Sequence, residues 1–213
     1  MKWIDPTTYK RAKHFAFFNG LDYPHFNVTA MVDIARLLPW AKENDYSIFR
    51  SILYFACRAA NDIPEFRQRI RDGKIVEHES AHPSYTSMTD NGVFSFTDVQ
   101  YEADMDGFFA NCVAQESIVK GEASLEDEAH RDDYLFISSL PWIHFTSFVH
   151  PVHISGLDSV PRLTWGKYQK EGERIALPFS VQIHHALADG SHVGEYFKLL
   201  QAYFDQVDRS LES

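Results

Sequence analysis

The sequence predicts one α/β domain in which helices cover one face of a largely antiparallel, mixed sheet. Helical patterns with apolar residues every three or four positions are interspersed with segments that alternate every second residue. No linker, repeat or low-complexity tract divides the chain. A chain of 213 residues is long enough to bury a core by itself, so we expect residues 1–213 to form a single domain.

The composition is that of a folded, aromatic-rich protein. Hydrophobic residues make up 45% of the chain, aromatic residues 15% and charged residues 23%, which excludes disorder over most of its length. The 17 Phe and 10 Tyr residues are more than a core of this size needs. Either some of them line a pocket or an interface, or the core itself is unusually aromatic.

The formal net charge of −10 restricts the partners. It repels phosphate backbones, so we expect no nucleic acid partner, and an anionic cofactor would need its own local Lys or Arg residues. No apolar run approaches membrane-spanning length, and the first residues lack the apolar segment of a signal peptide. Cys57 and Cys112 look like buried free thiols. We therefore expect a cytoplasmic protein without a membrane partner.

The secondary structure can be followed along the chain. Apolar spacing from Ile48 to Ile63 predicts a helix with one buried face, interrupted at 64–66 by Pro-Glu-Phe. Phenylalanines that alternate with Ser and Thr predict a half-buried strand at 93–99. The apolar pattern of residues 134–149 predicts two strands, with a break between them at Pro141. The segment 120–133 holds six acidic residues and is expected to be a solvated loop, with a lid as an alternative.

The clearest strand spans Arg174 to His184, with alternate apolar residues on one face. A tight turn containing Gly190 follows, and then a helix whose apolar stripe runs from Val193 to Val207. A long strand, a tight turn and a packed helix form a rigid frame, which is what a catalytic residue at a strand end requires.

The turn carries the sequence His184-His185-Ala-Leu-Ala-Asp189-Gly190. Adjacent strand residues point to opposite faces, so the two histidines cannot readily hold one ion, and we expect no metal site. Two alternatives remain, buried structural histidines or a general base, for which an ordinary pKa of about 6.5 is well suited. Asp189 either hydrogen-bonds the imidazole or braces the turn by pairing with a cation elsewhere.

The stretch from His185 to Gly190 matches the His-x-x-x-Asp-Gly motif of CoA-dependent acyltransferases. This motif is shared by chloramphenicol acetyltransferases, the cores of 2-oxoacid dehydrogenase complexes and peptide-synthetase condensation domains. The chain lacks the lipoyl domain of the oxoacid complexes, and it resembles chloramphenicol acetyltransferases from end to end. The separated motifs that carry this resemblance are Arg11 with His14-Phe15, Phe66-Arg67, Ile137-Ser-Ser-Leu-Pro-Trp142, Phe145-Thr-Ser-Phe148, Thr164-Trp-Gly-Lys-Tyr168 and Leu177-Pro-Phe-Ser-Val-Gln-Ile-His-His185.

The resemblance implies a two-layer α/β sandwich that assembles as a homotrimer with active sites at subunit interfaces. It implies that His185 removes the proton from an acceptor hydroxyl, which attacks the thioester of acetyl-CoA, the co-substrate. Ser138 matches the serine that stabilises the tetrahedral oxyanion. Asp189 and Arg11 match a salt bridge that positions the histidine loop, which favours the brace over the imidazole partner.

The same resemblance implies two binding regions. For the co-substrate it indicates Thr164, which acts through bound water, and Lys167 and Tyr168, which contact CoA. For the small-molecule alcohol acceptor it indicates a pocket formed by Phe18, Thr86, Phe94, Phe96, Phe148, His150 and Arg162.

Some acceptor positions depart from the family pattern. His150 and Arg162 stand where an aliphatic residue is expected, Phe96 stands where a small one is, and Phe18 stands where a tyrosine is often found. An arginine and a histidine in place of aliphatic residues would make the pocket more polar, unless Arg162, which follows Pro161, points out to solvent. Chloramphenicol remains the best single acceptor, and a more polar, heavily hydroxylated or anionic acceptor is the competitor.

Two other classes of function remain. A non-catalytic trimeric binding module would keep the fold without turnover, although intact His185, Ser138 and Asp189 argue against it. A hydrolase would use His185 to activate water, but the chain has no Gly-x-Ser-x-Gly elbow.

Overall fold

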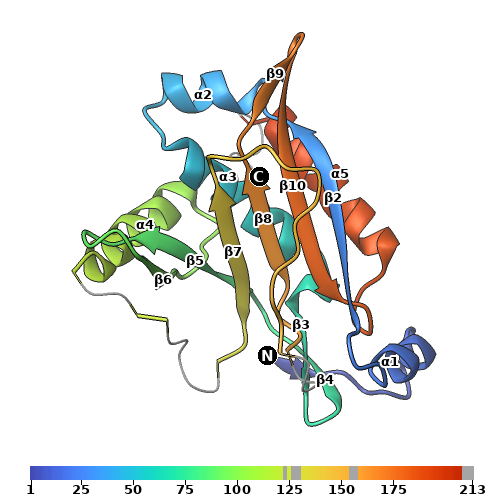
Figure 1. The fold of residues 1–213 in the computed structure, drawn as a ribbon. Helices are drawn as coiled ribbons and strands as arrows, with labels where there is room; N and C mark the ends of the chain where they lie inside the picture. Colours follow the sequence, from blue (N-terminus) through green and yellow to red (C-terminus); the bar gives the residue numbers. More distant parts are fainter. Residues whose placement is uncertain (122–123, 126–130, 154–157, 208–213) are drawn as a thin grey trace.

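The main sheet has seven strands and is mostly antiparallel. The computed structural model describes residues 1–121, 124–125, 131–153 and 158–207. The strands run in the order β2-β10-β8-β7-β5-β6, and β9 pairs with β10 (Figure 1). The pairs β5–β7 and β7–β8 are parallel and the other pairs are antiparallel. The strand bounds are β2 (His25–Asp33), β5 (His82–Met88), β6 (Phe94–Asp98), β7 (Tyr134–Leu140), β8 (Arg162–Gly166), β9 (Gln169–Glu171) and β10 (Arg174–His184).

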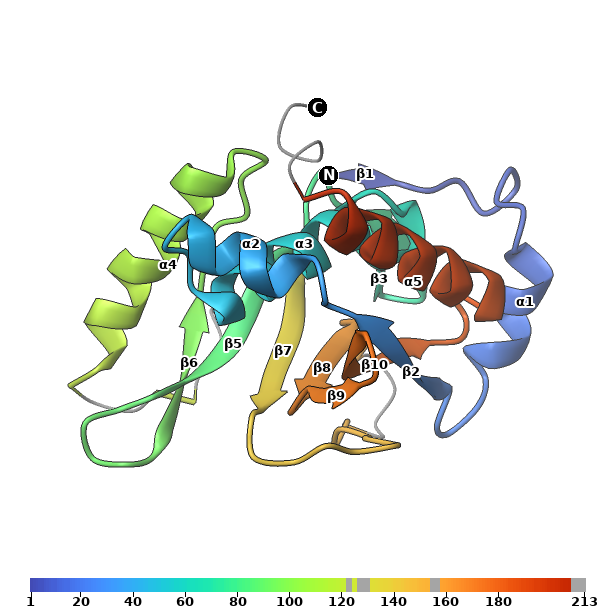
Figure 2. The ribbon, with the colours of Figure 1, turned by 90° about the horizontal axis from the view of Figure 1, so that it is seen from above.

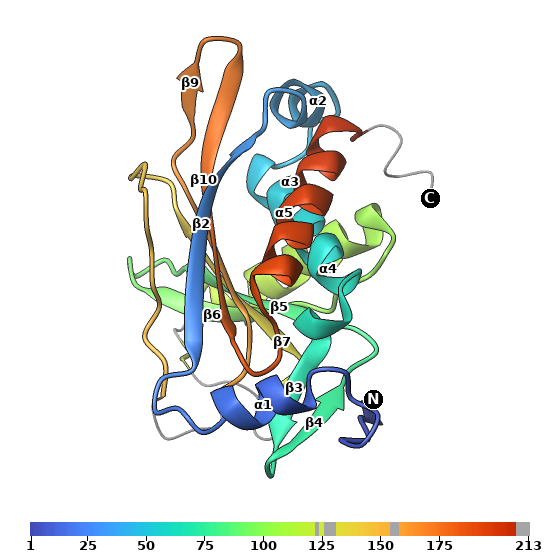
Figure 3. The ribbon, with the colours of Figure 1, turned by 90° about the vertical axis from the view of Figure 1, so that its right-hand side faces the viewer.

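The helices form a layer on one face of this sheet (Figures 2 and 3). This layer consists of α2 (Leu37–Glu43), α3 (Ile48–Asn61), α4 (Met105–Val119) and α5 (Gly190–Asp205). The short helix α1 (Ala12–Phe18) lies at the end of the sheet, near a small antiparallel sheet. That sheet has the order β1-β4-β3, with β1 (Lys2–Trp3), β3 (Gln68–Arg71) and β4 (Lys74–Glu77). The predicted fold class is therefore confirmed.

The core lies between the helices and the sheet. Ser47 begins α3 by accepting a hydrogen bond from the Arg50 backbone, and the buried face of the helix packs against α5. The break predicted at 64–66 is the 3-10 helix η1 (Pro64–Arg67). Cys57 and Cys112 are buried free thiols in this core, as predicted.

One face of β10 joins the core, as the alternation predicts. Its other face is buried as well, because residues 141–153 cross over it. Ser180 Oγ donates to the Phe148 carbonyl at 3.0 Å, and the Gln182 side chain accepts from the His150 backbone at 2.7 Å. The prediction of a second strand after Pro141 is therefore wrong. The apolar residues there pack over the sheet, and their backbone groups bond to β10 side chains instead of to a neighbouring strand.

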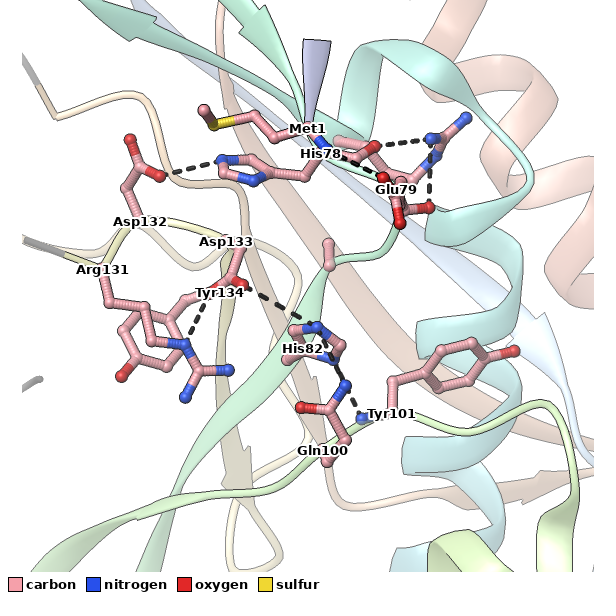
Figure 4. Close-up of polar contacts among 12 residues, drawn as sticks. Met1, His78, Glu79, His82, Gln100, Tyr101, Arg131, Asp132, Asp133 and Tyr134 are labelled. Carbon is pink, nitrogen blue, oxygen red and sulfur yellow. Dashed lines mark hydrogen bonds and ion pairs between the residues drawn. The ribbon is translucent and has the colours of Figure 1, made fainter.

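The acidic segment 120–133 lies partly outside the described residues, and its last three residues are not a solvated loop. Asp132 pairs with Arg71. It also accepts from His78 Nε2 at 2.9 Å, a contact drawn in Figure 4. Burial raises the pKa of Asp132, but the hydrogen bonds from His78 and Arg71 more than offset this and hold it well below its usual range. The prediction failed because the partners of Asp132, Arg71 on β3 and His78 after β4, lie far from it in the sequence.

Candidate active site

His185 follows β10 directly, in the turn between the strand and α5. Its ring stacks on Phe18 with ring centroids 3.8 Å apart and contacts Phe26 at 4.5 Å. Its Nδ1 lies 3.0 Å from the Ala188 carbonyl oxygen. Because a carbonyl can only accept, Nδ1 carries a proton, and in the neutral imidazole the lone pair of Nε2 is then free. Among the described residues Nε2 has no hydrogen-bond partner. This is the tautomer that a general base requires.

The turn that carries His185 is braced by an ion pair. Arg11 pairs with Asp189 and also donates to the His185 carbonyl at 3.1 Å. Asp189 caps α5 as well, since its Oδ1 accepts from the Ser191 backbone at 2.9 Å. In the described part of the chain Asp189 makes no bond to the His185 imidazole. Of the two alternatives for Asp189, the geometry is that of the brace.

The charge on Asp189 is stabilised by its surroundings. Partial burial raises its pKa, but the hydrogen bonds from Ser191 and the charges of His192 and Arg11 lower it well below the usual range. The carboxylate is therefore ionised throughout the neutral range, and the Arg11 ion pair persists there.

Ser138 lies in a different place, on the sheet face turned away from the helices. It is level with Thr164 on β8, which is level with Ser180 on β10, so hydroxyl side chains form a row across three strands. Ser138 lines a cavity of about 550 Å³. Its Oγ has no hydrogen-bond partner among the residues the structure describes, so its O–H is available to a ligand in the cavity.

Five of the seven predicted acceptor residues line this cavity: Thr86, Phe94, Phe96, His150 and Arg162. Phe148 lies behind, with its ring against His150 at 4.8 Å. Phe18 is not in the cavity, because it stacks on His185. The structure thus brings most of the acceptor set to Ser138 and leaves Phe18 with the histidine.

His150 and Thr164 bond to each other. His150 Nε2 contacts Thr164 Oγ1, and Thr164 is fully buried behind it, outside the cavity lining. Burial, followed by the charge of Arg162, lowers the pKa of His150 to about 4, so the imidazole is neutral at neutral pH. Thr164 therefore lies behind His150 and not against the cavity.

Arg162 does not point out to solvent, since it is 6% exposed. It pairs with Asp158 through both terminal nitrogens and donates to the Val160 carbonyl at 2.9 Å. Its guanidinium lies 5.3 Å from the centre of the Phe136 ring. Asp158 and Phe136 also line the cavity, and the sequence analysis missed both. Phe136 could have been predicted, because residues two apart in a strand point to the same face and Ser138 was already expected in the site. No sequence pattern marks Asp158 beyond its place four residues before Arg162.

Lys167 and Tyr168 lie at the far end of β8, and both are exposed. The Lys167 backbone binds residues 143 and 144: its N–H donates to the Ile143 carbonyl at 2.8 Å, and its carbonyl lies 2.9 Å from His144 Nδ1. Trp142 in the same segment is 73% exposed. An exposed tryptophan was not singled out from the sequence, because its apolar neighbours suggest a buried strand there.

Comparisons with known proteins point to the same family over nearly the whole chain. The family model described as chloramphenicol acetyltransferase matches residues 1–201. Chloramphenicol acetyltransferase 2 of Escherichia coli is 32% identical, covering 96% of this chain and 97% of its own. The chain belongs to the chloramphenicol acetyltransferase family. The enzyme of Bacillus pumilus that bears the family's name is also 32% identical, over 99% of this chain and 96% of its own.

A solved chloramphenicol acetyltransferase has the same fold, with a TM-score of 0.84 and 27% identity over 95% of this chain and 99% of that one. The dihydrolipoamide acetyltransferase of Azotobacter vinelandii shares the fold alone, with a TM-score of 0.67 and 16% identity over 94% of this chain and 88% of that one.

In this member of the chloramphenicol acetyltransferase family, His185 and Ser138 of the same chain lie far apart. Ser138 is level with Ser180, two strands away, and His185 lies five residues beyond Ser180. Standard strand spacings place the two residues roughly 15–20 Å apart. A base must come within about 3 Å of the proton it removes. His185 therefore cannot act on an acceptor bound beside Ser138 of its own chain in this arrangement.

Among the described residues, no group of three or more His, Cys, Asp or Glu side chains has a geometry that could hold a metal ion. None of the described helices is both long and apolar enough to span a membrane.

Proposed function

We propose that this protein transfers the acetyl group of acetyl-CoA to a hydroxyl of a small molecule, with chloramphenicol as the best-supported acceptor. The observation that carries the proposal is the hydrogen bond from His185 Nδ1 to the Ala188 carbonyl, which leaves Nε2 free to take a proton. Relatives named chloramphenicol acetyltransferase align with nearly the whole chain, which supports the choice of acceptor. An enzyme of this activity would confer resistance to the drug.

In the proposed reaction His185 Nε2 removes the proton from the acceptor hydroxyl as its oxygen attacks the thioester carbonyl. This base catalysis contributes about 10²–10⁴ in rate. Ser138 Oγ–H donates to the oxyanion that develops on the carbonyl oxygen, which contributes on the order of 10²–10³. Protonated His185 then returns its proton to the departing thiolate of CoA. Arg11 and Asp189 keep the imidazole in place throughout.

The residues at the end of β8 suit an anionic, aromatic co-substrate. Lys167 after β8 and Lys170 on β9 supply the local positive charge that a protein of net charge −10 would need near a phosphate. Trp142 and Tyr168 expose large aromatic surfaces beside them, on which a nucleotide base can stack. We infer that these residues hold CoA when it binds, and that Lys167 and Tyr168 have the roles that the resemblance implies.

We further propose that the protein is a homotrimer and that each active site forms between two chains. The distance between His185 and Ser138 in one chain supports this, because a complete site then needs His185 of one subunit and the cavity of the next. A cyclic trimer supplies three such contacts. Because acetyl-CoA is a metabolite of the cytosol, we infer a cytoplasmic location.

One observation favours a second candidate acceptor. The Arg162–Asp158 ion pair and His150 make one wall of the cavity polar, where an apolar aromatic drug would be better served by aliphatic side chains. A more polar alcohol is therefore the alternative to chloramphenicol within the same chemistry.

The first test is release of the CoA thiol from acetyl-CoA, with and without chloramphenicol, by wild type, His185→Ala and the control His14→Ala. His14 is an exposed histidine on α1. Drug-dependent release that His185→Ala abolishes and His14→Ala preserves would establish the chemistry, the base and the acceptor. Equal release by wild type and His185→Ala would refute His185 as the base, and no release with any alcohol would favour a binding module.

A further inference from the structure

The wall of the Ser138 cavity contains a buried ion pair that the proposed chemistry does not use. The side chain of Arg162 is 7% exposed and that of Asp158 is 13% exposed, and both line the cavity. Neither group touches His185 or Ser138 in the described structure. Removing two charges from water costs several kcal/mol, and well-packed apolar residues of the same volume would often be as stable. This makes a role in binding a reasonable explanation for the pair.

The pair retains unused hydrogen-bonding capacity. A guanidinium has five N–H donors. Arg162 uses three of them among the described residues, two toward Asp158 and one toward the Val160 carbonyl. Each Asp158 oxygen accepts one of these bonds and has a further lone pair. Donors and acceptors therefore lie side by side on one wall, with no net charge. A hydroxyl group, which both donates and accepts, matches such a wall better than an anion or a cation does.

The other side of the cavity is aromatic. Phe94 and Phe96 from β6 and Phe136 from β7 line it, and the Arg162 guanidinium lies over the Phe136 ring. Flat aromatic faces pack well against the C–H face of a saturated ring. Ser138 lies in the same cavity, so a ring held there would place a neighbouring primary hydroxyl near the oxyanion donor.

From these two walls we propose that the more polar acceptor, the alternative to chloramphenicol, is a polyhydroxylated ring, as in a sugar. Its C–H face packs on the phenylalanines, and a second hydroxyl binds Asp158 and Arg162 while a primary hydroxyl is acetylated. The inference rests on the proposed acyl transfer at this cavity and names the substrate class. Asp158 and Arg162 are then specificity-determining residues, which select a second hydroxyl without taking part in the chemistry.

A matched pair of compounds tests this on the unaltered enzyme. Methyl α-D-glucopyranoside and cyclohexylmethanol both carry a primary alcohol on a six-membered ring, and only the first has ring hydroxyls. Affinity for each is measured by calorimetry, and acetyl transfer to each by CoA thiol release. We expect the glycoside to bind roughly 10- to 100-fold more tightly and to be acetylated with a correspondingly higher kcat/KM, because bonds to charged partners are lost in the other compound. Equal affinity, or preference for cyclohexylmethanol, overturns the inference.

A double variant gives a second test of the role of Asp158 and Arg162. Arg162→Met with Asp158→Leu removes both charges together, so no unpaired buried charge remains. It should bind cyclohexylmethanol at least as well as wild type does and lose the preference for the glycoside. The control is Arg71→Met, which removes an arginine paired with Asp132 outside the cavity lining and should leave the preference unchanged. A folded double variant that keeps the preference contradicts the inference.

These measurements separate the two levels of the proposal. If chloramphenicol is acetylated but the glycoside is not preferred, the substrate class is wrong and the acyl transfer stands. If no alcohol releases CoA but calorimetry shows the preference, the proposed function is wrong and the ligand class stands.

Discussion

The His185 turn and the Ser138 cavity are built in opposite ways. The turn is largely local: β10 ends, a few residues form the turn, and Asp189 caps the helix that follows, with Arg11, Phe18 and Phe26 as its distant supports. The cavity collects side chains from β5, β6, β7, β8 and the segment that crosses β10. The difference suggests that the chemistry resides in a rigid, short motif, whereas the choice of acceptor depends on side chains that can change one at a time without altering the turn.

Replacing His185 in the turn should lower kcat more than any other change predicted here. His185→Ala removes the imidazole whose Nε2 is placed to accept a proton, so kcat should fall about 10²–10⁴-fold. Thermal unfolding should show a folded protein, because the brace between Arg11 and Asp189 does not involve the ring. A loss of less than tenfold, with His14→Ala behaving like wild type, would remove His185 from the chemistry.

Ser138→Ala tests in the same way whether the serine in the cavity takes part in catalysis. Loss of the oxyanion donor should lower kcat on the order of 10²–10³-fold with little change in KM. Ser139 is the matched control, since neighbouring residues of a strand point to opposite faces. Ser139→Ala should leave kcat unchanged. If both variants lose activity equally, the loss reflects a disturbed strand β7 and not the removal of a hydroxyl that donates to the oxyanion.

The brace should have a smaller effect than the base. Arg11→Met leaves Asp189 without its cation and frees the His185 carbonyl. Because the Asp189 side chain is 33% exposed, the free energy of unfolding should fall by only about 1–2 kcal/mol. The histidine turn should also become less well held, and kcat should drop about tenfold. Arg11→Lys should restore part of both quantities, and a variant with wild-type kcat would show that the turn needs no brace.

Acid should lower the stability of both regions through buried histidines, His150 in the cavity wall and His184 at the end of β10. Burial, then the charge of Arg162, lowers the pKa of His150 to about 4, and burial, then His25, lowers that of His184 to about 4. Between about pH 6.5 and 4 the unfolded chain binds protons that the folded protein does not, so the free energy of unfolding falls as the pH falls.

The measurement for this effect is denaturant unfolding at pH 7 and at pH 4.5. We expect His150→Gln, which keeps a side chain able to bond Thr164, to lose about 1–2 kcal/mol less than wild type over this interval. The exposed residue His14 gives the control, His14→Gln, which should follow wild type. An identical acid loss in all three proteins would contradict the shifted pKa of His150.

The two halves also differ in how far the sequence predicts them. The strand, the turn and the helix around His185 follow from periodicity and capping within a short stretch. In the cavity, Thr86, Phe94 and Phe96 were predicted, but Asp158 was not, because its role depends on a partner that the fold buries beside it. The loop after Pro141 was predicted as a strand because packing over a sheet and pairing within a sheet leave similar apolar patterns.

Mixed oligomers of two inactive variants test directly whether His185 of one chain serves the Ser138 cavity of another. His185→Ala and Ser138→Ala chains, differently tagged, are expressed together and the mixed species is assayed for CoA thiol release against each variant alone. In a cyclic trimer each mixed species, of either composition, has intact His185 opposite intact Ser138 at one of its three sites, so about a third of wild-type activity should return. Activity no higher than the average of the two separate variants would contradict a site shared between chains.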